Sequence, residues 1–284
     1  MFSDVLLTVD FDRTLTDPAS RIPERNLGAI RFFIANGGTF TVNTGRSVPM
    51  CRRFMHDVPV NAPLLVYNGA AWYDVKTGEL SNCYLIDADP KEVVSSVQSR
   101  FPELLLEIQG IDAHYAFQKH SIWQTYCENN QGTWAYADPS ETGPFLKFSL
   151  AIFESENVSD VYKTIDWEQE LFRSAYDYIM QTYEGLVDAT YACPRILDVQ
   201  AKDVSKSRSA LDLKKKLGKK ILVCVGDALN DVSMLDGADY AFCPADGVVA
   251  DRYPNVCNCG DGAVAEVIYK KIPEILGFQL DNPA

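Results

Sequence analysis

The sequence contains few histidines and no long apolar run. Its 284 residues include only three histidines, His56, His114 and His120. None of them has the spacing of a zinc site or of a catalytic triad, so we expect each to be structural or exposed. No apolar stretch approaches the length of a membrane span, so we expect no membrane partner.

Basic residues are outnumbered by acidic ones. The chain has 26 Lys and Arg against 39 Asp and Glu, a formal net charge of −13. A nucleic-acid partner needs a basic face, so we expect none. A small phosphorylated substrate is still compatible with this charge, because one lysine and a metal ion can reverse the field locally.

Cysteine pairs with the spacing of zinc ligands are also missing. The eight cysteines include no CxxC motif, and only Cys257 and Cys259 lie close together, as a weak candidate for a metal or redox site. No basic segment precedes the short apolar stretch at the N-terminus, and Asp4 interrupts it. We therefore expect no signal peptide, reduced thiols and a cytoplasmic location.

Two aspartates directly follow the first apolar run. Val5–Val9 is short, β-branched and bounded by polar residues, which predicts a buried strand, and Asp10 and Asp12 stand at its carboxyl end. Strands buried on both faces belong to parallel sheets, whose chemistry lies at that end. Because two adjacent carboxylates repel each other, they favour a hard divalent cation such as Mg²⁺. The alternative is a strand end with two solvated aspartates.

Further acids follow a second apolar run. Ile221–Val225 also reads as a buried strand, and it leads into Gly226-Asp227-Ala-Leu-Asn230-Asp231. If the two strands are neighbours, acids from both ends of the sequence meet at one edge of the sheet. The prediction of an enzyme depends on this proximity.

Five short motifs occur in a fixed order. They are Asp10-Phe-Asp12-Arg13-Thr14-Leu15, Thr44-Gly45-Arg46, Asn68-Gly69-Ala70, Lys206 and Gly226-Asp227-Ala-Leu-Asn230-Asp231. Together they resemble the signatures of the haloacid dehalogenase superfamily, most closely its Cof-like branch with a large α/β cap of type IIB. Each motif is weak alone, whereas the ordered set is specific. It covers two segments, one near each end of the chain, and the middle matches only in length and position.

The alternation of elements predicts an α/β fold, a Rossmann-like parallel sheet core with an inserted α/β cap domain. A helix beginning at Pro23 lies between the Val5 strand and a strand at Thr39–Asn43. A second helix within residues 47–57 leads to a further strand at Leu64–Tyr67, which makes a βαβαβ unit. A final helix is expected over 262–275. The middle segment is too long for a loop. We expect the core at 1–82 and 193–284 and the cap at 83–192.

The resemblance implies a role for each motif residue in phosphoryl transfer. Asp10 would be the nucleophile and Asp12 the general acid and base. Mg²⁺ would be held by Asp10, the Asp12 carbonyl, Asp227 and, in support, Asp231; Thr44, Gly45, Lys206 and Asn230 would bind or orient the phosphoryl group. Without the resemblance, Lys206 could be a surface lysine, Asp231 an early-helix acid and Thr44 a helix cap.

Two arginines remain ambiguous. Arg13 replaces the glycine that the family usually has after the second aspartate, so it either donates to an anionic substrate or points to solvent. Arg46 either binds phosphate or pairs with a core carboxylate.

The preferred function is a Mg²⁺-dependent phosphatase for small phosphate monoesters, sugar phosphates in particular, acting through an aspartyl-phosphate. The alternatives are a sugar-phosphate phosphomutase and a non-catalytic metabolite-binding protein with a vestigial site. Only Arg13 favours the last.

Overall fold

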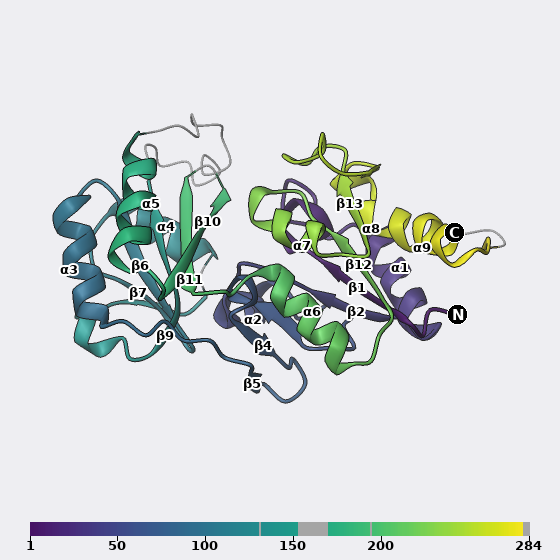
Figure 1. The fold of residues 1–284 in the computed structure, drawn as a ribbon, viewed down its shortest axis with the longest axis horizontal. Coiled ribbons are helices and arrows are strands. Elements are labelled where there is room, and N and C mark those ends of the chain that lie inside the picture. The colour runs from purple at the N-terminus through teal and green to yellow at the C-terminus, as the bar shows by residue number, and fades with distance from the viewer. Residues whose placement is uncertain (131, 153–169, 194, 281–284) are drawn as a thin grey trace.

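The computed structural model describes residues 1–130, 132–152, 170–193 and 195–280. It contains a parallel sheet with helices and a second, larger sheet inserted between the two chain segments that build the first (Figure 1). This confirms the predicted α/β class with a parallel core and an inserted cap. Among the described helices, none has the length and apolar character needed to cross a membrane.

Five parallel strands form the core sheet. They are β1 (Val5–Val9), β2 (Thr39–Val42), β12 (Ile221–Val225), β13 (Tyr240–Pro244) and β14 (Asn255–Val256), in the order β14-β13-β12-β1-β2. Every residue of β1 is buried, as expected for a strand covered on both faces. The register pairs Val9 with both Val225 and Val42. The residues that follow these three strands therefore meet at one edge of the sheet.

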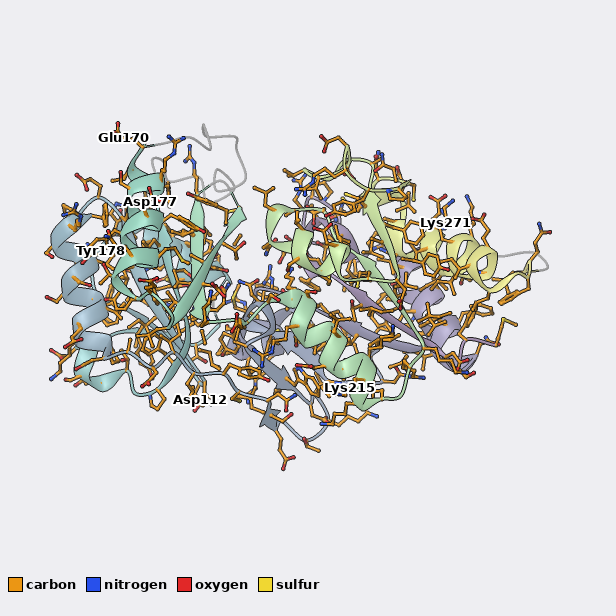
Figure 2. The ribbon with its side chains drawn as sticks, viewed as in Figure 1. Asp112, Glu170, Asp177, Tyr178, Lys215 and Lys271 are labelled. Carbon is orange, nitrogen blue, oxygen red and sulfur yellow. The ribbon has the colours of Figure 1, made fainter. Side chains whose placement is uncertain are left out.

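Helices and short turns surround this sheet. The helices are α1 (Glu24–Ala35), α2 (Val48–Phe54), α6 (Lys206–Lys216), α7 (Val232–Asp236), α8 (Ala263–Glu266) and α9 (Ile272–Leu276), and the turns are η1 (Phe11–Leu15), η2 (Tyr67–Gly69), η5 (Leu229–Asp231), η6 (Cys259–Asp261) and η7 (Val267–Lys271). In α1 the buried residues Leu27, Ile30 and Phe33 follow the helical period and confirm the helix predicted there. Charged side chains such as Lys215 lie on the outside (Figure 2).

Two local predictions differ from the structure. The strand predicted at Leu64–Tyr67 is β3 (Leu64–Val66), but it pairs antiparallel with β4 (Ala71–Tyr73). These two strands and β5 (Leu80–Ser81) form a small separate sheet, which meets the core sheet through a parallel bridge between Asn43 and Leu65. An apolar run predicts a buried strand but does not specify its partner.

The final helix is not continuous. The segment 262–275, predicted as one helix, is divided into α8, the π-helical turn η7 and α9. Pro273 lies in the first turn of α9, and a proline has no N–H to donate to the preceding turn. The change in hydrogen bonding is therefore expected just before it.

The second sheet has six strands. They are β6 (Leu105–Gly110), β7 (His114–Ala116), β8 (Trp134–Tyr136), β9 (Phe145–Ala151), β10 (Val187–Cys193) and β11 (Ile196–Ala201), in the order β10-β11-β9-β6-β7-β8. All described pairs are antiparallel except β7 with β8. The helices of this region are α3 (Pro90–Arg100), α4 (Ser121–Asn130) and α5 (Glu170–Thr182), with one short turn η3 (Pro139–Glu141).

The two faces of this sheet are covered differently. Val97 of α3 and Ile179 of α5 share a buried apolar cluster with Phe148 of β9, so these helices cover one face (Figure 1). Trp123 of α4 packs with Leu105 at one end of the other face. The rest of that second face points towards the core.

The sheet also suggests where the inserted unit ends. Its strand β11 (Ile196–Ala201) lies after residue 192, the boundary expected from the sequence, yet it pairs with β9 and β10. We therefore propose that the cap extends to about Ala201, and that α6 begins the second core segment.

Candidate active site

Three acidic side chains meet at the carboxyl edge of the core sheet. Asp10 follows β1, Asp227 follows β12, and Asp231 lies in η5. One carboxylate oxygen from each lies within 4.8 Å of the others, and the residues are only 7%, 3% and 0% exposed. Acids 217 and 221 residues after Asp10 are brought together because β1 and β12 are neighbouring parallel strands.

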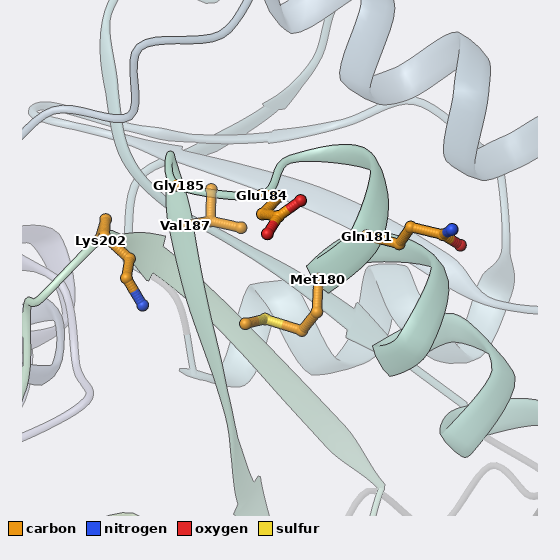
Figure 3. Close-up of a pocket in the computed structure, with 6 residues that line it drawn as sticks. All are labelled: Met180, Gln181, Glu184, Gly185, Val187 and Lys202. Carbon is orange, nitrogen blue, oxygen red and sulfur yellow. The ribbon is translucent and has the colours of Figure 1, made fainter.

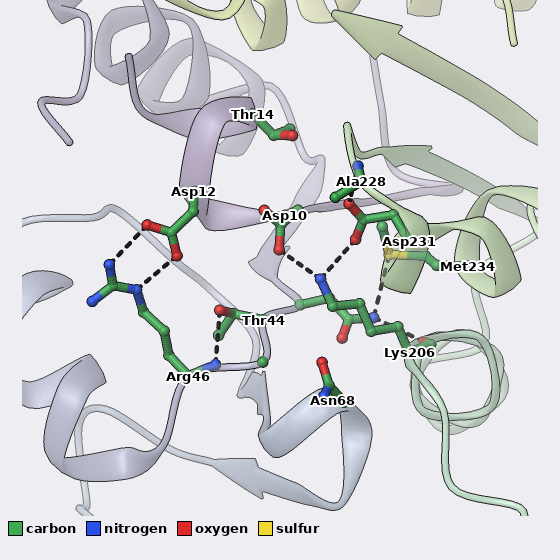
Figure 4. Close-up of polar contacts among 12 residues, drawn as sticks. Asp10, Asp12, Thr14, Thr44, Arg46, Asn68, Lys206, Ala228, Asp231 and Met234 are labelled. Atoms are coloured by element: carbon green, nitrogen blue, oxygen red, sulfur yellow. Dashed lines mark hydrogen bonds and ion pairs between the residues drawn. The ribbon is translucent and has the colours of Figure 1, made fainter. Parts of the chain in front are cut away.

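A buried lysine ties two of these acids together. The Lys206 ammonium lies 2.6 Å from Asp10 Oδ1 and 2.6 Å from Asp231 Oδ1 (Figure 4). Burial alone would lower the Lys206 pKa, but the two carboxylates raise it above its ordinary value. Lys206 is therefore a charged residue of the cluster and not a surface lysine.

The cluster carries more negative than positive charge. Burial, followed by repulsion from neighbouring acids, raises the Asp10 pKa well above its usual range, although Lys206 opposes this. Burial and then Asp231 raise the pKa of Asp227 to about 7, against a hydrogen bond of 2.8 Å from Thr14 Oγ1. One lysine among three buried carboxylates leaves an excess of negative charge, which a divalent cation would neutralise. This donor set of hard oxygens fits Mg²⁺.

Asp231 already uses both of its oxygens. Oδ1 accepts from Lys206, while Oδ2 accepts from the backbone N–H groups of Asp227 and Ala228, each at 3.0 Å. By contrast, the second oxygens of Asp10 and Asp227 accept no hydrogen bond from the described residues. We therefore propose Asp10 and Asp227 as the carboxylate metal ligands, with Asp231 shaping the loop and holding Lys206.

Asp12 points away from this cluster, towards Arg46. Arg46 Nε and Nη2 donate to the two Asp12 oxygens at 2.8 and 2.7 Å, a bidentate ion pair (Figure 4). The guanidinium also lies over the rings of Phe54 and Phe11, at 4.6 and 5.2 Å from the ring centres. The sequence left Arg46 either as a phosphate ligand or as the partner of a core carboxylate. In the structure it forms an ion pair with the carboxylate of Asp12.

Arg13 adopts an unusual backbone conformation. Its φ is +58°, in the left-handed region that favours glycine, and its N–H donates to Thr16 Oγ1 at 3.1 Å. The half-buried side chain makes no hydrogen bond with the described residues. Its charge is near enough to Asp227 to oppose the rise of that pKa, as the weakest of the contributions.

Of the other predicted phosphate ligands, Thr44 and Gly45 follow β2 and Asn230 follows β12. Thr44 is buried, and its hydroxyl accepts from Arg46 N at 3.1 Å. A side chain at Gly45 would place a Cβ 2.8 Å from Asn68 Oδ1, so this loop approaches Asn68 as only glycine can. Asn230 lies half-buried in η5, and among the described residues its side chain has no hydrogen-bond partner.

Sequence reasoning missed several contacts at this edge. The sequence motif gives Thr14 no role, yet its hydroxyl donates to Asp227. From the cap, Lys147 Nζ donates to Gly45 O at 2.9 Å, and Asn68 Nδ2 of the core donates to Asp198 Oδ2 of β11 at 2.8 Å. Polar residues at alternate positions of the cap strands were the available signal, but such a pattern usually indicates a solvent-exposed face.

A hollow elsewhere on the cap does not belong to this site. It is lined by Met180, Gln181, Glu184, Gly185, Val187 and Lys202, and it contains none of the residues predicted from the motifs (Figure 3). The Lys202 ammonium is paired with Asp188 at 2.7 Å. The buried acid cluster is therefore the better candidate for chemistry.

Comparisons with known proteins identify the family of the chain. A protein of Buchnera aphidicola subsp. Baizongia pistaciae, provisionally named a phosphatase, is 23% identical over 233 residues, which cover 81% of this chain and 82% of that protein. The 5-amino-6-(5-phospho-D-ribitylamino)uracil phosphatase of Bacillus subtilis is 21% identical over 245 residues, covering 82% and 80%. A solved subclass IIB sugar phosphatase has a TM-score of 0.70 at 17% identity, covering 96% and 98%. The model of the haloacid dehalogenase-like hydrolase family matches residues 7–249, and the chain belongs to this family of enzymes.

Proposed function

We propose that the protein is a Mg²⁺-dependent phosphatase that hydrolyses small phosphate monoesters, sugar phosphates in particular, through an aspartyl-phosphate. The observation that carries the proposal is the contact of Asp10 with Lys206 inside a buried cluster that also contains Asp227. The names of the two phosphatase relatives and of the sugar phosphatase structure support the same reaction class. The eight unpaired cysteines favour a cytoplasmic location.

The residues suit a two-step reaction. In the first step a carboxylate oxygen of Asp10 attacks phosphorus, the ester P–O bond breaks, and Asp12 in its protonated form gives its proton to the leaving alcohol. In the second step water attacks the aspartyl-phosphate, passes a proton to Asp12 and releases inorganic phosphate. Lys206 lowers the repulsion between the Asp10 anion and the phosphoryl group.

The metal and the phosphate loop complete the site. Asp10, Asp227 and the Asp12 carbonyl would hold Mg²⁺, which supplies positive charge for the phosphoryl oxygens. The Thr44 hydroxyl and the Gly45 N–H would bind those oxygens, and Asn230 would orient the group. Arg46 holds Asp12 in one orientation, so we propose that Arg46 positions the acid and does not bind substrate directly.

The test is hydrolysis of p-nitrophenyl phosphate and of a panel of sugar phosphates, with Mg²⁺ and with EDTA. Asp10→Asn keeps the size of the side chain but removes the nucleophile, so we expect kcat to fall more than about 10³-fold. Asp177→Asn, at an exposed position on α5, is the matched control and should not change kcat (Figure 2).

Product analysis separates the alternatives. Release of inorganic phosphate supports hydrolysis, whereas an isomeric sugar phosphate supports mutase action. Substantial turnover by Asp10→Asn, or turnover by the wild-type enzyme that is unaffected by EDTA, would falsify the proposal.

A further inference from the structure

Three neighbouring cap strands carry polar side chains on a single buried face. The six residues are Glu107 and Gln109 of β6, Lys147 and Ser149 of β9, and Asp198 and Gln200 of β11, and none is more than 4% exposed. The strand register arranges them in two rows, Glu107–Ser149–Asp198 and Gln109–Lys147–Gln200. We call these six residues the polar grid. A buried surface of this kind needs an explanation, because burying polar groups is costly.

The polar grid faces the candidate phosphate-binding loop. Lys147 Nζ donates to Gly45 O at 2.9 Å, and Asp198 accepts from Asn68 Nδ2 at 2.8 Å. Beside the grid, His114 Nε2 lies 2.5 Å from Ser47 Oγ, at the start of α2. In Figure 4, Asn68 lies next to Thr44, whose carbonyl accepts from the Asn68 N–H at 3.0 Å. A substrate whose phosphate binds at Thr44 and Gly45 would therefore have its alcohol portion near this face.

Two amide oxygens of the grid lack partners among the described residues. Gln109 Oε1 and Gln200 Oε1 accept no hydrogen bond, and they flank Lys147 within one row. The orientation of the Gln109 amide follows from its partners, since its Nε2 contacts a Glu107 oxygen, which can only accept. Gln109 therefore offers a buried acceptor, and the Gln200 oxygen is a second buried atom without a partner, so a ligand with O–H or N–H donors would satisfy them.

The charge of the grid disfavours a second anion. It holds two carboxylates and one ammonium, and Lys147 is already paired with Asp198 at 2.8 Å. Burial tends to raise the Glu107 pKa, but His114 and then Lys147 keep it below its ordinary value, so Glu107 is ionised at neutral pH. A phosphate or carboxylate on the alcohol portion of a substrate would meet these two negative charges.

We propose that the polar grid binds the leaving group of the substrate and selects a neutral polyhydroxy alcohol over one with a second anionic group. This inference rests on the proposed phosphatase function. Hydroxyl groups of the sugar or polyol donate to Gln109 and Gln200 and accept from Lys147. Because the core covers the grid in this structure, the cap has to move away from the core before substrate enters.

The first experiment compares matched substrates. Glucose 6-phosphate and sorbitol 6-phosphate have neutral alcohol portions, whereas 6-phosphogluconate has the same chain length and one added carboxylate. With Mg²⁺, we expect kcat/KM for the two neutral esters to exceed that for 6-phosphogluconate by at least about tenfold. Equal values for the three esters, with all of them hydrolysed, would overturn the role of the grid and leave the phosphatase function intact.

The second experiment removes one acceptor. Gln200→Leu deletes the amide without breaking any hydrogen bond among the described residues, so the variant should fold, with a Tm equal to or above that of the wild type. We expect the ratio of kcat/KM for sorbitol 6-phosphate to kcat/KM for p-nitrophenyl phosphate to fall about tenfold. Gln181→Leu, at the surface of the cap, should leave this ratio unchanged. If the Gln200→Leu variant does not fold, the Gln200→Met variant is used in its place.

The outcomes are distinguishable. An unchanged ratio in a folded Gln200 variant rules out the grid as the leaving-group surface. Absence of Mg²⁺-dependent hydrolysis of every ester, p-nitrophenyl phosphate included, overturns the proposed function and this inference together.

Discussion

At the scale of single residues, the ion pair between Arg46 and Asp12 defines how the proposed general acid is held. Both Asp12 oxygens accept from one planar guanidinium, which itself lies over the rings of Phe11 and Phe54. A carboxylate fixed in this way has few orientations open to it. Proton transfer from Asp12 should therefore depend on the two parallel hydrogen bonds from the planar guanidinium as well as on its charge.

This dependence gives a prediction for Arg46→Lys. Lysine retains the charge but loses the bidentate geometry, so we expect kcat for a sugar phosphate to fall about 10–100-fold. The loss for p-nitrophenyl phosphate should be smaller, because p-nitrophenolate leaves with little help from an acid. Steady-state kinetics on both esters measure the difference. Arg21→Lys, in an exposed ion pair with Asp17, is the control, and equal losses on both esters would contradict a positioning role.

The sequence predicted some of these residues and not others, for physical reasons. Asp10 and Asp227 could be placed together because acids at the ends of neighbouring parallel strands must share an edge of the sheet. The partner of Arg46 could not be chosen, since a long side chain can reach several loops. Lys147 could not be placed either, because alternation along a strand does not reveal whether water or another domain covers its polar face.

At the scale of elements, α6 delivers a charged residue into the middle of the acid cluster. Lys206 is the first residue of this helix, and Ser205 precedes it as the N-cap, accepting from Arg208 N. Lys206 is 1% exposed and contacts two carboxylates. The start of α6 therefore contributes to the stability of the core as well as to the proposed chemistry.

We predict that Lys206→Met destabilises the metal-free protein by about 3–5 kcal/mol at pH 8, since two buried carboxylates lose their cation. The effect should be smaller at pH 5, because the raised pKa of Asp10 favours its neutral form as the pH falls. Urea unfolding in EDTA at both pH values measures the change. Lys214→Met, which removes a more exposed pair with Asp239, should cost less than about 1 kcal/mol, and a similar loss for both variants would refute the argument.

The sequence predicted helices and strands correctly where the apolar pattern was long or where the order of the elements implied which strands are neighbours. The strands β1, β2 and β12 and the helix α1 agree with the sequence patterns. By contrast, β3 was assigned to the wrong sheet, because three buried residues carry no information about strand direction. In the last helix, the position of Pro273 was visible in the sequence, whereas the π-turn before it depends on backbone hydrogen bonds.

At the scale of the whole molecule, the acid cluster makes the free energy of unfolding depend on pH and on metal binding. The Asp227 pKa is raised to about 7 from an ordinary value of 3.8. Between these values the folded, metal-free protein binds more protons than the unfolded chain, so its free energy of unfolding falls as pH rises. Mg²⁺ displaces the proton, and its stabilising effect should therefore grow with pH.

We thus expect about 5 mM Mg²⁺ to raise Tm more at pH 8 than at pH 6. Thermal unfolding with and without the metal at both pH values tests this. Asp227→Asn removes the titrating carboxylate and should reduce both the Mg²⁺ effect and its pH dependence. The same increase in Tm at pH 6 and pH 8 would show that Asp227 does not control the site.

The order of strands also has a consequence for how the protein is made. β1 lies between β2 and β12, which are separated from each other by more than half of the chain. While a ribosome is still synthesising residues beyond the cap, β1 has one unpaired edge, and unpaired edges invite contact with other chains. The six strands of the cap sheet are complete by Ala201, before β12 exists. The nascent chain therefore carries a complete cap sheet beside an incomplete core sheet, and its need for chaperones should be greatest in that interval.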